Sequence, residues 1–174
     1  MAIKMQKRQK LRTLTATALL AAAALTLSFI ESTALASLAP PGVKPGLSNI
    51  AVMFACFSVS PLSAVCVGLV KSGFAAITGG LVSGFISLCG GLVSIAGQII
   101  LMKFAKKTLS YTGIAVISAL LHNFGQLAAA SLTVGSLLYL YYAPVLIISA
   151  VAGGLVTGII LTAVMPSLKK LVKQ

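Results

Sequence analysis

The sequence predicts an all-α membrane protein, and both its composition and the arrangement of its apolar residues indicate this class. Of the 174 residues, 59% are hydrophobic and only 8% are charged, whereas about 25% of the residues in a soluble domain are charged. A soluble core of this size could not bury that much apolar surface. The apolar runs are continuous rather than alternating, which is typical of membrane-spanning helices and not of a β-barrel. We therefore predict one polytopic bundle of six helices.

The charged residues are almost all basic and lie mainly outside the apolar runs. The chain contains thirteen Lys and Arg residues but a single acidic residue, Glu31, so the formal net charge is +12. In a soluble protein this excess would suggest nucleic acid. Here the basic clusters lie where membrane orientation and anionic lipid headgroups require them, so we expect a membrane partner and no nucleic-acid partner.

The positions of the basic clusters predict the topology. If the amino-terminal cluster is cytoplasmic, six spans place the clusters at residues 103–107 and 169–173 on the same side. We therefore expect a multi-pass protein of the cell membrane with both termini cytoplasmic. Basic tails at residues 1–12 and 167–174 would flank a membrane domain at residues 13–166.

Proline and glycine residues divide the apolar sequence into the expected helices. Three prolines and two glycines between residues 39 and 46 exclude a helix there. Pro61 and the pair Gly79–Gly80 mark two further breaks. The second apolar segment is only about 12 residues long, so we expect it to be tilted or partly inserted beside a cavity. The expected helices are 14–30, 47–58, 61–77, 84–102, 111–134 and 144–164.

The first expected helix allows two interpretations. A basic segment followed by an apolar run is also typical of a secretory signal peptide, and residues 34–36 resemble a cleavage site. We favour an uncleaved helix, because the run is long for a signal peptide and the rest of the chain is itself membrane-embedded. Ala18 and Ala22, four residues apart, form a small-residue face that lets another helix approach closely. A simple low-complexity anchor is the alternative.

Several polar side chains interrupt the apolar runs and are candidates for binding a small molecule. His122, Asn123 and Gln126 lie in the middle of the expected helix at residues 111–134, where polar groups usually face a bundle interior or a cavity. Lys71 lies inside the expected helix at residues 61–77. At that depth a lysine must reach the membrane surface, pair with another group or serve a function.

The candidate residues nearest the outer surface carry more positive than negative charge. Lys44 lies in the first outer loop, Asn49 starts the second helix, and Lys71 lies in the outer half of the third. Glu31 is expected at the same level and could pair with either lysine. Two lysines against one acid leave a surplus positive charge, which suits a small anionic ligand. A purely structural polar cluster is the alternative interpretation.

The sequence argues against catalysis and against a metal or cofactor. It contains no Asp and a single Glu, so it cannot build the clustered carboxylates that hold Mg²⁺ against a diphosphate. The sequence has no nucleotide-binding motif. Cys56, Cys66 and Cys89 lack CxxC spacing and need no role beyond that of small buried hydrophobes. We expect no enzyme activity, no catalytic residue, no metal and no cofactor.

Three stretches of the sequence resemble the Gx transporter family, which is also catalogued as component I of heptaprenyl diphosphate synthase. They are GVKPGLSNI at residues 42–50, SLCGGLVS at residues 87–94 and HNFGQL at residues 122–127. The likeness runs from about Leu14 to the carboxyl terminus. Pro45 is a departure, since many relatives carry Leu there, and it leaves the expected conformation of the first loop in doubt.

This family in turn resembles the substrate-binding S components of energy-coupling factor transporters, which are six-helix membrane proteins. The resemblance implies that the first loop helps to cover an outward-facing site for a small anionic, vitamin-like or isoprenoid-like substrate. It also implies that Ala18 and Ala22 dock onto a T component and that partner ATPase subunits supply the energy. The alternatives are a non-catalytic membrane subunit associated with heptaprenyl diphosphate synthase and a membrane scaffold.

Overall fold

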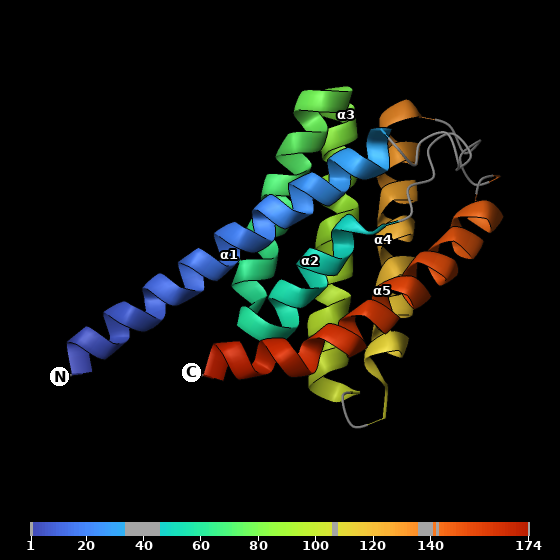
Figure 1. Cartoon of the computed structure of the whole chain (residues 1–174). Coiled ribbons are helices and arrows are strands. Elements are labelled where there is room, and N and C mark those ends of the chain that lie inside the picture. Colours follow the sequence, from blue (N-terminus) through green and yellow to red (C-terminus); the bar gives the residue numbers. More distant parts are fainter. Residues whose placement is uncertain (1, 34–45, 106–107, 136–140, 142, 174) are drawn as a thin grey trace.

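The structure is all-α, as predicted, throughout the part of the chain that it describes (Figure 1). This computed structural model describes residues 2–33, 46–105, 108–135, 141 and 143–173. Five α-helices and one π-helical segment make up the fold. They are α1 (Ala2–Thr33), α2 (Ser48–Phe54), the π-helical segment η1 (Ala55–Val59), α3 (Pro61–Phe104), α4 (Tyr111–Val134) and α5 (Ala143–Lys173).

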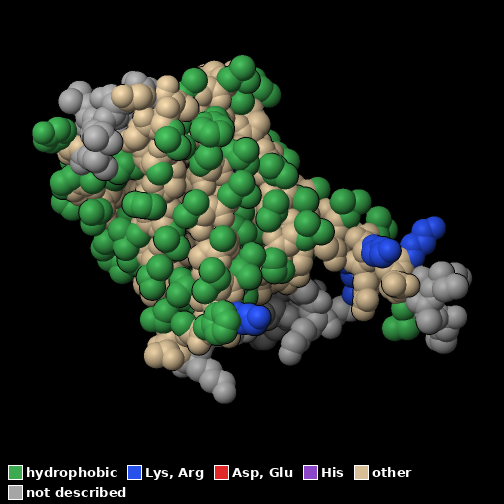
Figure 2. Space-filling model, turned by 180° about the vertical axis from the view of Figure 1, so that it is seen from behind, with side chains coloured by type: hydrophobic (Ala, Val, Ile, Leu, Met, Phe, Trp, Pro, Cys, Tyr) green, Lys and Arg blue, Asp and Glu red, His purple; other side chains and the backbone are tan. Residues whose placement is uncertain are grey.

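Four of the described helices, α1, α3, α4 and α5, are long and apolar enough to cross a membrane. Their outward surfaces carry many large hydrophobic side chains; Ile77 and Leu81, for example, are each 85% exposed. Figure 2 shows one face of the molecule that is mostly hydrophobic, with Lys and Arg side chains visible only along its right and lower edges. A continuous apolar surface of this kind suits contact with lipid rather than with water.

The expected count of six helices is wrong, because the third and fourth expected helices form the single helix α3. Its 44 residues would extend about 66 Å if straight, roughly twice the thickness of the hydrocarbon layer. Gly80 turns the chain back with φ 84 and ψ 165, a conformation essentially restricted to glycine. The break expected at Gly79–Gly80 is therefore a kink within α3 (Figure 1).

The two limbs of α3 pack against each other as a helical hairpin. A Cβ atom built on Gly84 would lie 2.5 Å from the Cβ of Ala76, and one built on Gly68 would lie 3.2 Å from Cδ1 of Ile95. Small residues on both limbs thus allow their backbones to approach closely, as in other membrane helix pairs. The hairpin makes α3 long enough for two passes of a membrane.

The short second segment and its break have the expected positions. Helix α2 and segment η1 together cover Ser48–Val59. The N–H of Ser60 donates to the carbonyl of Ala55 at 3.0 Å, which closes the π-helical turn. Ser60 then adopts an extended conformation, and its hydroxyl accepts from the N–H of Ser63 at 3.0 Å. With Pro61 at the first helical position, this is a standard helix start.

The described parts of both basic end segments are helical. Helix α1 begins at Ala2 and α5 continues to Lys173, so both helices extend beyond their expected ends. Lys, Arg, Gln and Met are good helix formers, and no proline or glycine interrupts residues 2–12. Pro166 lies inside α5, where it removes one backbone hydrogen bond without ending the helix.

Segment α2–η1 lies at the centre of the bundle and contacts α1, α3 and α5. On one side its apolar residues pack with α1 and α3, and on the other with α4 and α5. The first cluster includes Ala24, Val52, Ala55, Cys56 and Val67. The second includes Met53, Phe54, Ala115, Leu161 and Met165. A segment too short to span a membrane alone is thus held by its neighbours.

The chain ends and the connection between α3 and α4 lie at the same end of the molecule, opposite the kink of α3 (Figure 1). The three basic clusters are located in or beside these parts of the sequence. The described helix ends that carry basic residues, namely the start of α1, the end of α3 with Lys103 and the end of α5, therefore lie at one end of the fold, as the positive-inside rule favours in a polytopic protein.

Helices α4 and α5 approach closely at Gly154 and Gly158. A Cβ atom on Gly154 would lie 2.6 Å from Cα of Val116, and one on Gly158 would lie 2.4 Å from Cα of Thr112. Because the atoms that would be struck belong to the backbone, a side chain at either position must push the two helices apart. The GxxxG pair of α5 is therefore a packing contact.

We predict that Gly158→Ala lowers the free energy of unfolding by about 1–3 kcal/mol, because overpacking displaces α4. Gly73→Ala is the matched control, since a Cβ there meets nothing within 4 Å and alanine favours a helix by about 0.5–1 kcal/mol over glycine. Thermal unfolding in detergent measures both. A Gly158→Ala protein as stable as the wild type would contradict the close α4–α5 contact.

Candidate functional site

The only acidic side chain of the protein fixes the start of α2. Glu31, near the end of α1, is 2% exposed. Its carboxylate accepts hydrogen bonds from the backbone N–H of Leu47 and, at 2.7 Å, from the hydroxyl of Ser48. A carboxylate satisfies the N–H groups at a helix start especially well, because its charge complements the helix dipole. Glu31 thus ties α1 to the start of α2.

The next residue of α2 holds Lys71. The ammonium of Lys71 donates a hydrogen bond to Oδ1 of Asn49. Both side chains are half-buried, and they come from α2 and from the first limb of α3. Two adjacent residues of α2 therefore bond to different helices. Ser48 donates to the carboxylate of Glu31 on α1, and Asn49 accepts from the ammonium of Lys71 on α3. Because Asn49 is neutral, this contact orients the lysine without cancelling its charge.

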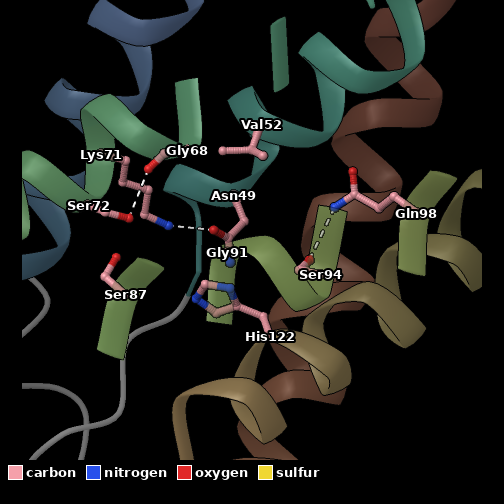
Figure 3. A pocket seen from close by; sticks show the side chains of 10 residues that line it. All are labelled: Asn49, Val52, Gly68, Lys71, Ser72, Ser87, Gly91, Ser94, Gln98 and His122. Carbon is pink, nitrogen blue, oxygen red and sulfur yellow. Dashed lines mark hydrogen bonds between the residues drawn. The ribbon is translucent and has the colours of Figure 1, made fainter. Parts of the chain in front are cut away.

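A small polar cavity lies beside the Lys71–Asn49 contact, between α2, both limbs of α3 and α4 (Figure 3). It has about 10 Å³ of space, which is enough for roughly one water molecule. In Figure 3 the ring of His122 lies below the contact of Lys71 with Asn49. Most of the lining groups are polar although the bundle around them is apolar. The lining residues are Asn49, Val52, Gly68, Lys71, Ser72, Ser87, Gly91, Ser94, Gln98 and His122.

A chain of hydrogen bonds runs from the cavity into the interface of α3 and α4. Nε2 of Gln98 donates to the hydroxyl of Ser94 at 3.2 Å, and this hydroxyl donates to the carbonyl of Ser118 at 3.0 Å. Gln98 is 1% exposed and Ser94 is 5% exposed. The second limb of α3 thus supplies a buried polar stripe, which is costly in an apolar bundle unless its groups are paired.

The structure brings together three of the six predicted binding residues: Asn49, Lys71 and His122. Asn123 does not line the cavity. Its Nδ2 donates to the carbonyl of Leu146 at 2.9 Å and so links α4 to α5. Lys44 lies outside the described residues.

Gln126 also has a packing position rather than a place in the cavity lining. A Cβ atom on Gly90 would lie 2.5 Å from Cγ of Gln126 and 2.7 Å from the backbone oxygen of His122. The side chain of Gln126 therefore covers the bare backbone of the second limb of α3. Gly90 is needed here because α4 occupies the space of a side chain.

Apart from Lys71, sequence reasoning missed the polar residues that α3 contributes to the lining: Ser72, Ser87, Ser94 and Gln98. A usable signal was present, because Ser87, Gly91, Ser94 and Gln98 recur every three or four residues and so share one helix face. The hydroxyl and amide groups of Ser87, Ser94 and Gln98 make this helix face polar.

Ala18 and Ala22 lie on the outer face of α1. Both are exposed, whereas Ala24 is fully buried against α2 and α3. Thr17 marks the inner face, since its hydroxyl donates to that of Ser63 at 2.9 Å. The small-residue face is therefore directed away from the bundle, where another helix can reach it.

The cavity has the chemistry of a binding site for a small polar molecule. It combines one cation, two side-chain amides, an imidazole and three serine hydroxyls. Hydrogen-bond donors and a positive charge in a nearly dry site favour an anionic group. Among the described residues, no group of three or more His, Cys, Asp or Glu side chains could hold a metal ion.

Comparison with known proteins identifies one family. Residues 20–164 match the family described as heptaprenyl diphosphate synthase component I. No curated protein and no solved structure matches the chain.

We predict that Glu31→Gln loosens α2, because a neutral amide cannot replace the charge-assisted hydrogen bonds to Leu47 and Ser48. Cys56 in η1 is 3% exposed and reports such opening through its reaction with a thiol reagent. Losing one charge-assisted bond costs about 1.5–3 kcal/mol, so labelling should become roughly tenfold to a hundredfold faster.

The measurement uses a protein in which Cys56 is the only cysteine. Cys66 is exposed and Cys89 is partly exposed, so both are replaced by alanine. Ser32→Ala is the control, because the hydroxyl of Ser32 bonds only to the nearby carbonyl of Phe29 on the exposed surface of α1. Equal labelling rates for Glu31→Gln and the wild type would show that the carboxylate does not hold α2 in place.

Proposed function

The chain belongs to the family described as heptaprenyl diphosphate synthase component I, and from this premise we propose that it is the substrate-binding membrane subunit of an importer of the energy-coupling factor type. Its substrate would be a small anionic molecule. The observation that carries the proposal is the polar cavity with Lys71 on its wall, enclosed by an apolar helical bundle.

The balance of charge supports an anionic substrate. The chain has 13 basic residues and one acid, and the carboxylate of that acid, Glu31, is bound to the start of α2. Lys71 donates a hydrogen bond to the neutral side chain of Asn49 and shares the cavity lining with serines of α3. An anionic group entering the cavity would gain a charge-assisted hydrogen bond from the ammonium.

The size of the cavity implies that the substrate enters by moving a wall. A space for about one water molecule cannot hold a metabolite. Segment α2–η1 is the wall best suited to move, because it is short and ends in a π-helical turn, a feature that is frequent at functional sites. Capture by movement of a covering segment is common in binding sites that must exclude water.

The orientation follows from the positions of the basic clusters. We place the end of the bundle that holds both termini and the α3–α4 connection in the cytoplasm, as the positive-inside rule favours. The membrane domain then covers residues 13–166, and the helical basic ends at residues 1–12 and 167–174 face the cytoplasm. The first outer loop, with Lys44, would lie over the substrate site.

A second candidate function is a non-catalytic membrane subunit of a heptaprenyl diphosphate synthase, which the description of the family favours. The sequence has no Asp and only Glu31 as an acid, so it cannot supply the carboxylates that hold Mg²⁺ during prenyl transfer. A soluble partner would have to carry the chemistry.

Co-purification from membranes separates the two functions. The importer requires that tagged protein bring down a T component and ATPase subunits, because this chain has no nucleotide-binding motif. Recovery of a soluble prenyl diphosphate synthase instead would favour the second function and overturn the first. Recovery of neither partner would favour a membrane scaffold.

We predict that Lys71→Met removes most of the small molecule retained by the purified protein. Loss of one charge-assisted contact costs about 1.5–3 kcal/mol, or roughly tenfold to a hundredfold in affinity. Native mass spectrometry measures the retained fraction. Lys103→Met is the control, since Lys103 lies at the end of α3 beside the ring of Phe104, outside the cavity. Equal retention by Lys71→Met and the wild type would remove Lys71 from the site.

We also predict that Ala18→Leu and Ala22→Leu weaken co-purification of the partner helix without lowering thermal stability. Both alanines are exposed, so leucine fits the isolated protein but holds a closely packed partner away. Ala24→Leu is the contrasting control, because Ala24 is 0% exposed and leucine there should destabilise the bundle itself. Unchanged co-purification by the two outward-facing variants would contradict a docking face on α1.

A further inference from the structure

The hydrogen bonds of Ser94 determine which way the amide of Gln98 faces. The hydroxyl of Ser94 has one proton, and the carbonyl of Ser118 accepts it at 3.0 Å. Since a carbonyl can only accept, the same hydroxyl must accept from Gln98, whose nearest atom at 3.2 Å is therefore the donor Nε2. The amide oxygen Oε1 of Gln98 is thus directed away from Ser94.

This oxygen is a buried acceptor that still needs a donor. Gln98 is 1% exposed, and its Oε1 has no hydrogen-bond partner within the described part of the chain. A buried polar atom left in this state typically costs about 1–3 kcal/mol. Because Gln98 also lines the cavity, a molecule in the cavity can supply the missing donor.

The cavity therefore has two chemically different ends. Lys71 and its partner Asn49 lie on one side of the lining, and Gln98, whose Oε1 has no partner in the described part of the chain, lies on the other (Figure 3). Both limbs of α3 contribute to the lining, and the second limb rises about 10 Å from Gly91 to Gln98. The side chain of a helical residue leans toward the amino terminus, which brings Gln98 back toward Ser94 and the cavity.

We propose that the substrate carries two groups: an anion for Lys71 and a hydrogen-bond donor, hydroxyl or N–H, for Oε1 of Gln98. This inference rests on the proposed substrate-binding function and narrows its substrate to small hydroxy or amino acids. An isoprenoid diphosphate fits poorly, because its hydrocarbon tail would leave Oε1 buried without a donor. Gln98 is thus a residue that selects the substrate.

The experiment compares two series of probes on the purified protein in detergent. The first series is the ω-hydroxy carboxylates from hydroxybutanoate to hydroxyoctanoate, and the second is the unsubstituted carboxylates of the same chain lengths. Thermal stabilisation at increasing probe concentration gives the affinity of each. At the best chain length we expect the hydroxy acid to bind the wild-type protein about tenfold more tightly than its unsubstituted partner.

Two matched variants test whether Gln98 is responsible. Gln98→Met keeps the length of the side chain and removes the acceptor, so it should abolish the preference while leaving the affinity for the unsubstituted acid within about twofold. Gln126→Met makes the same change on α4, outside the cavity lining, and should keep the preference.

The outcomes separate this inference from the function on which it rests. Equal affinity of the wild type for both series overturns the role of Gln98 but leaves an anion-binding cavity, and it is also the result expected if a fixed water satisfies Oε1. A preference that survives in Gln98→Met likewise overturns it. Failure of the wild type to bind any member of either series overturns both proposals.

Discussion

The structure depends on one constraint: polar groups inside an apolar bundle must find their partners within the bundle. Glu31 and Lys71 are the clearest cases. The carboxylate of Glu31 binds the first groups of α2, and the next residue, Asn49, binds the ammonium of Lys71. Helix α2 has seven residues and is followed by a π-helical turn. This segment is too short to span the membrane, so contacts with its neighbours must hold it in place. It is fixed at its start by the acid and along its sides by two apolar clusters.

Segment α2–η1 therefore has two roles: it packs between the long helices, and it forms one wall of the polar cavity. Because α2 closes the cavity and is held both by Glu31 at its start and by two apolar clusters along its sides, the contacts that order it also set how readily it opens. The remaining walls are rigid by comparison. The limbs of α3 meet at Gly84 and Ala76, and α4 meets α3 at Gly90 and Gly125, where added Cβ atoms would lie 3.1 Å or less from a neighbouring atom. The two limbs of α3 and helix α4 form three close-packed walls of the cavity, and α2, bonded to Glu31, forms the fourth. Such a cavity is suited to binding and release of a small molecule.

Much of the fold could be predicted from the sequence, because continuous apolar runs and prolines act locally. The all-α class, the break at Pro61 and the short second segment follow from such signals, and the fold bears them out. The helix count failed because Gly80 turns α3 within one helix, and the basic ends are helical because nothing in them interrupts a helix. Within the site, Asn49, Lys71 and His122 were predicted, but the rotation of α4 was not. Adjacent helical residues differ by about 100° in direction, so His122 faces the cavity while Asn123 faces α5.

The most direct test of the central claim is an electron cryomicroscopy map of the protein purified from its native membrane, at a resolution that shows ordered water. The account predicts density for a small molecule between the ammonium of Lys71 and the amide oxygen of Gln98, with α2 still joined to Glu31. A map in which the cavity holds only a water molecule and the Lys71 side chain extends to the membrane surface would contradict it.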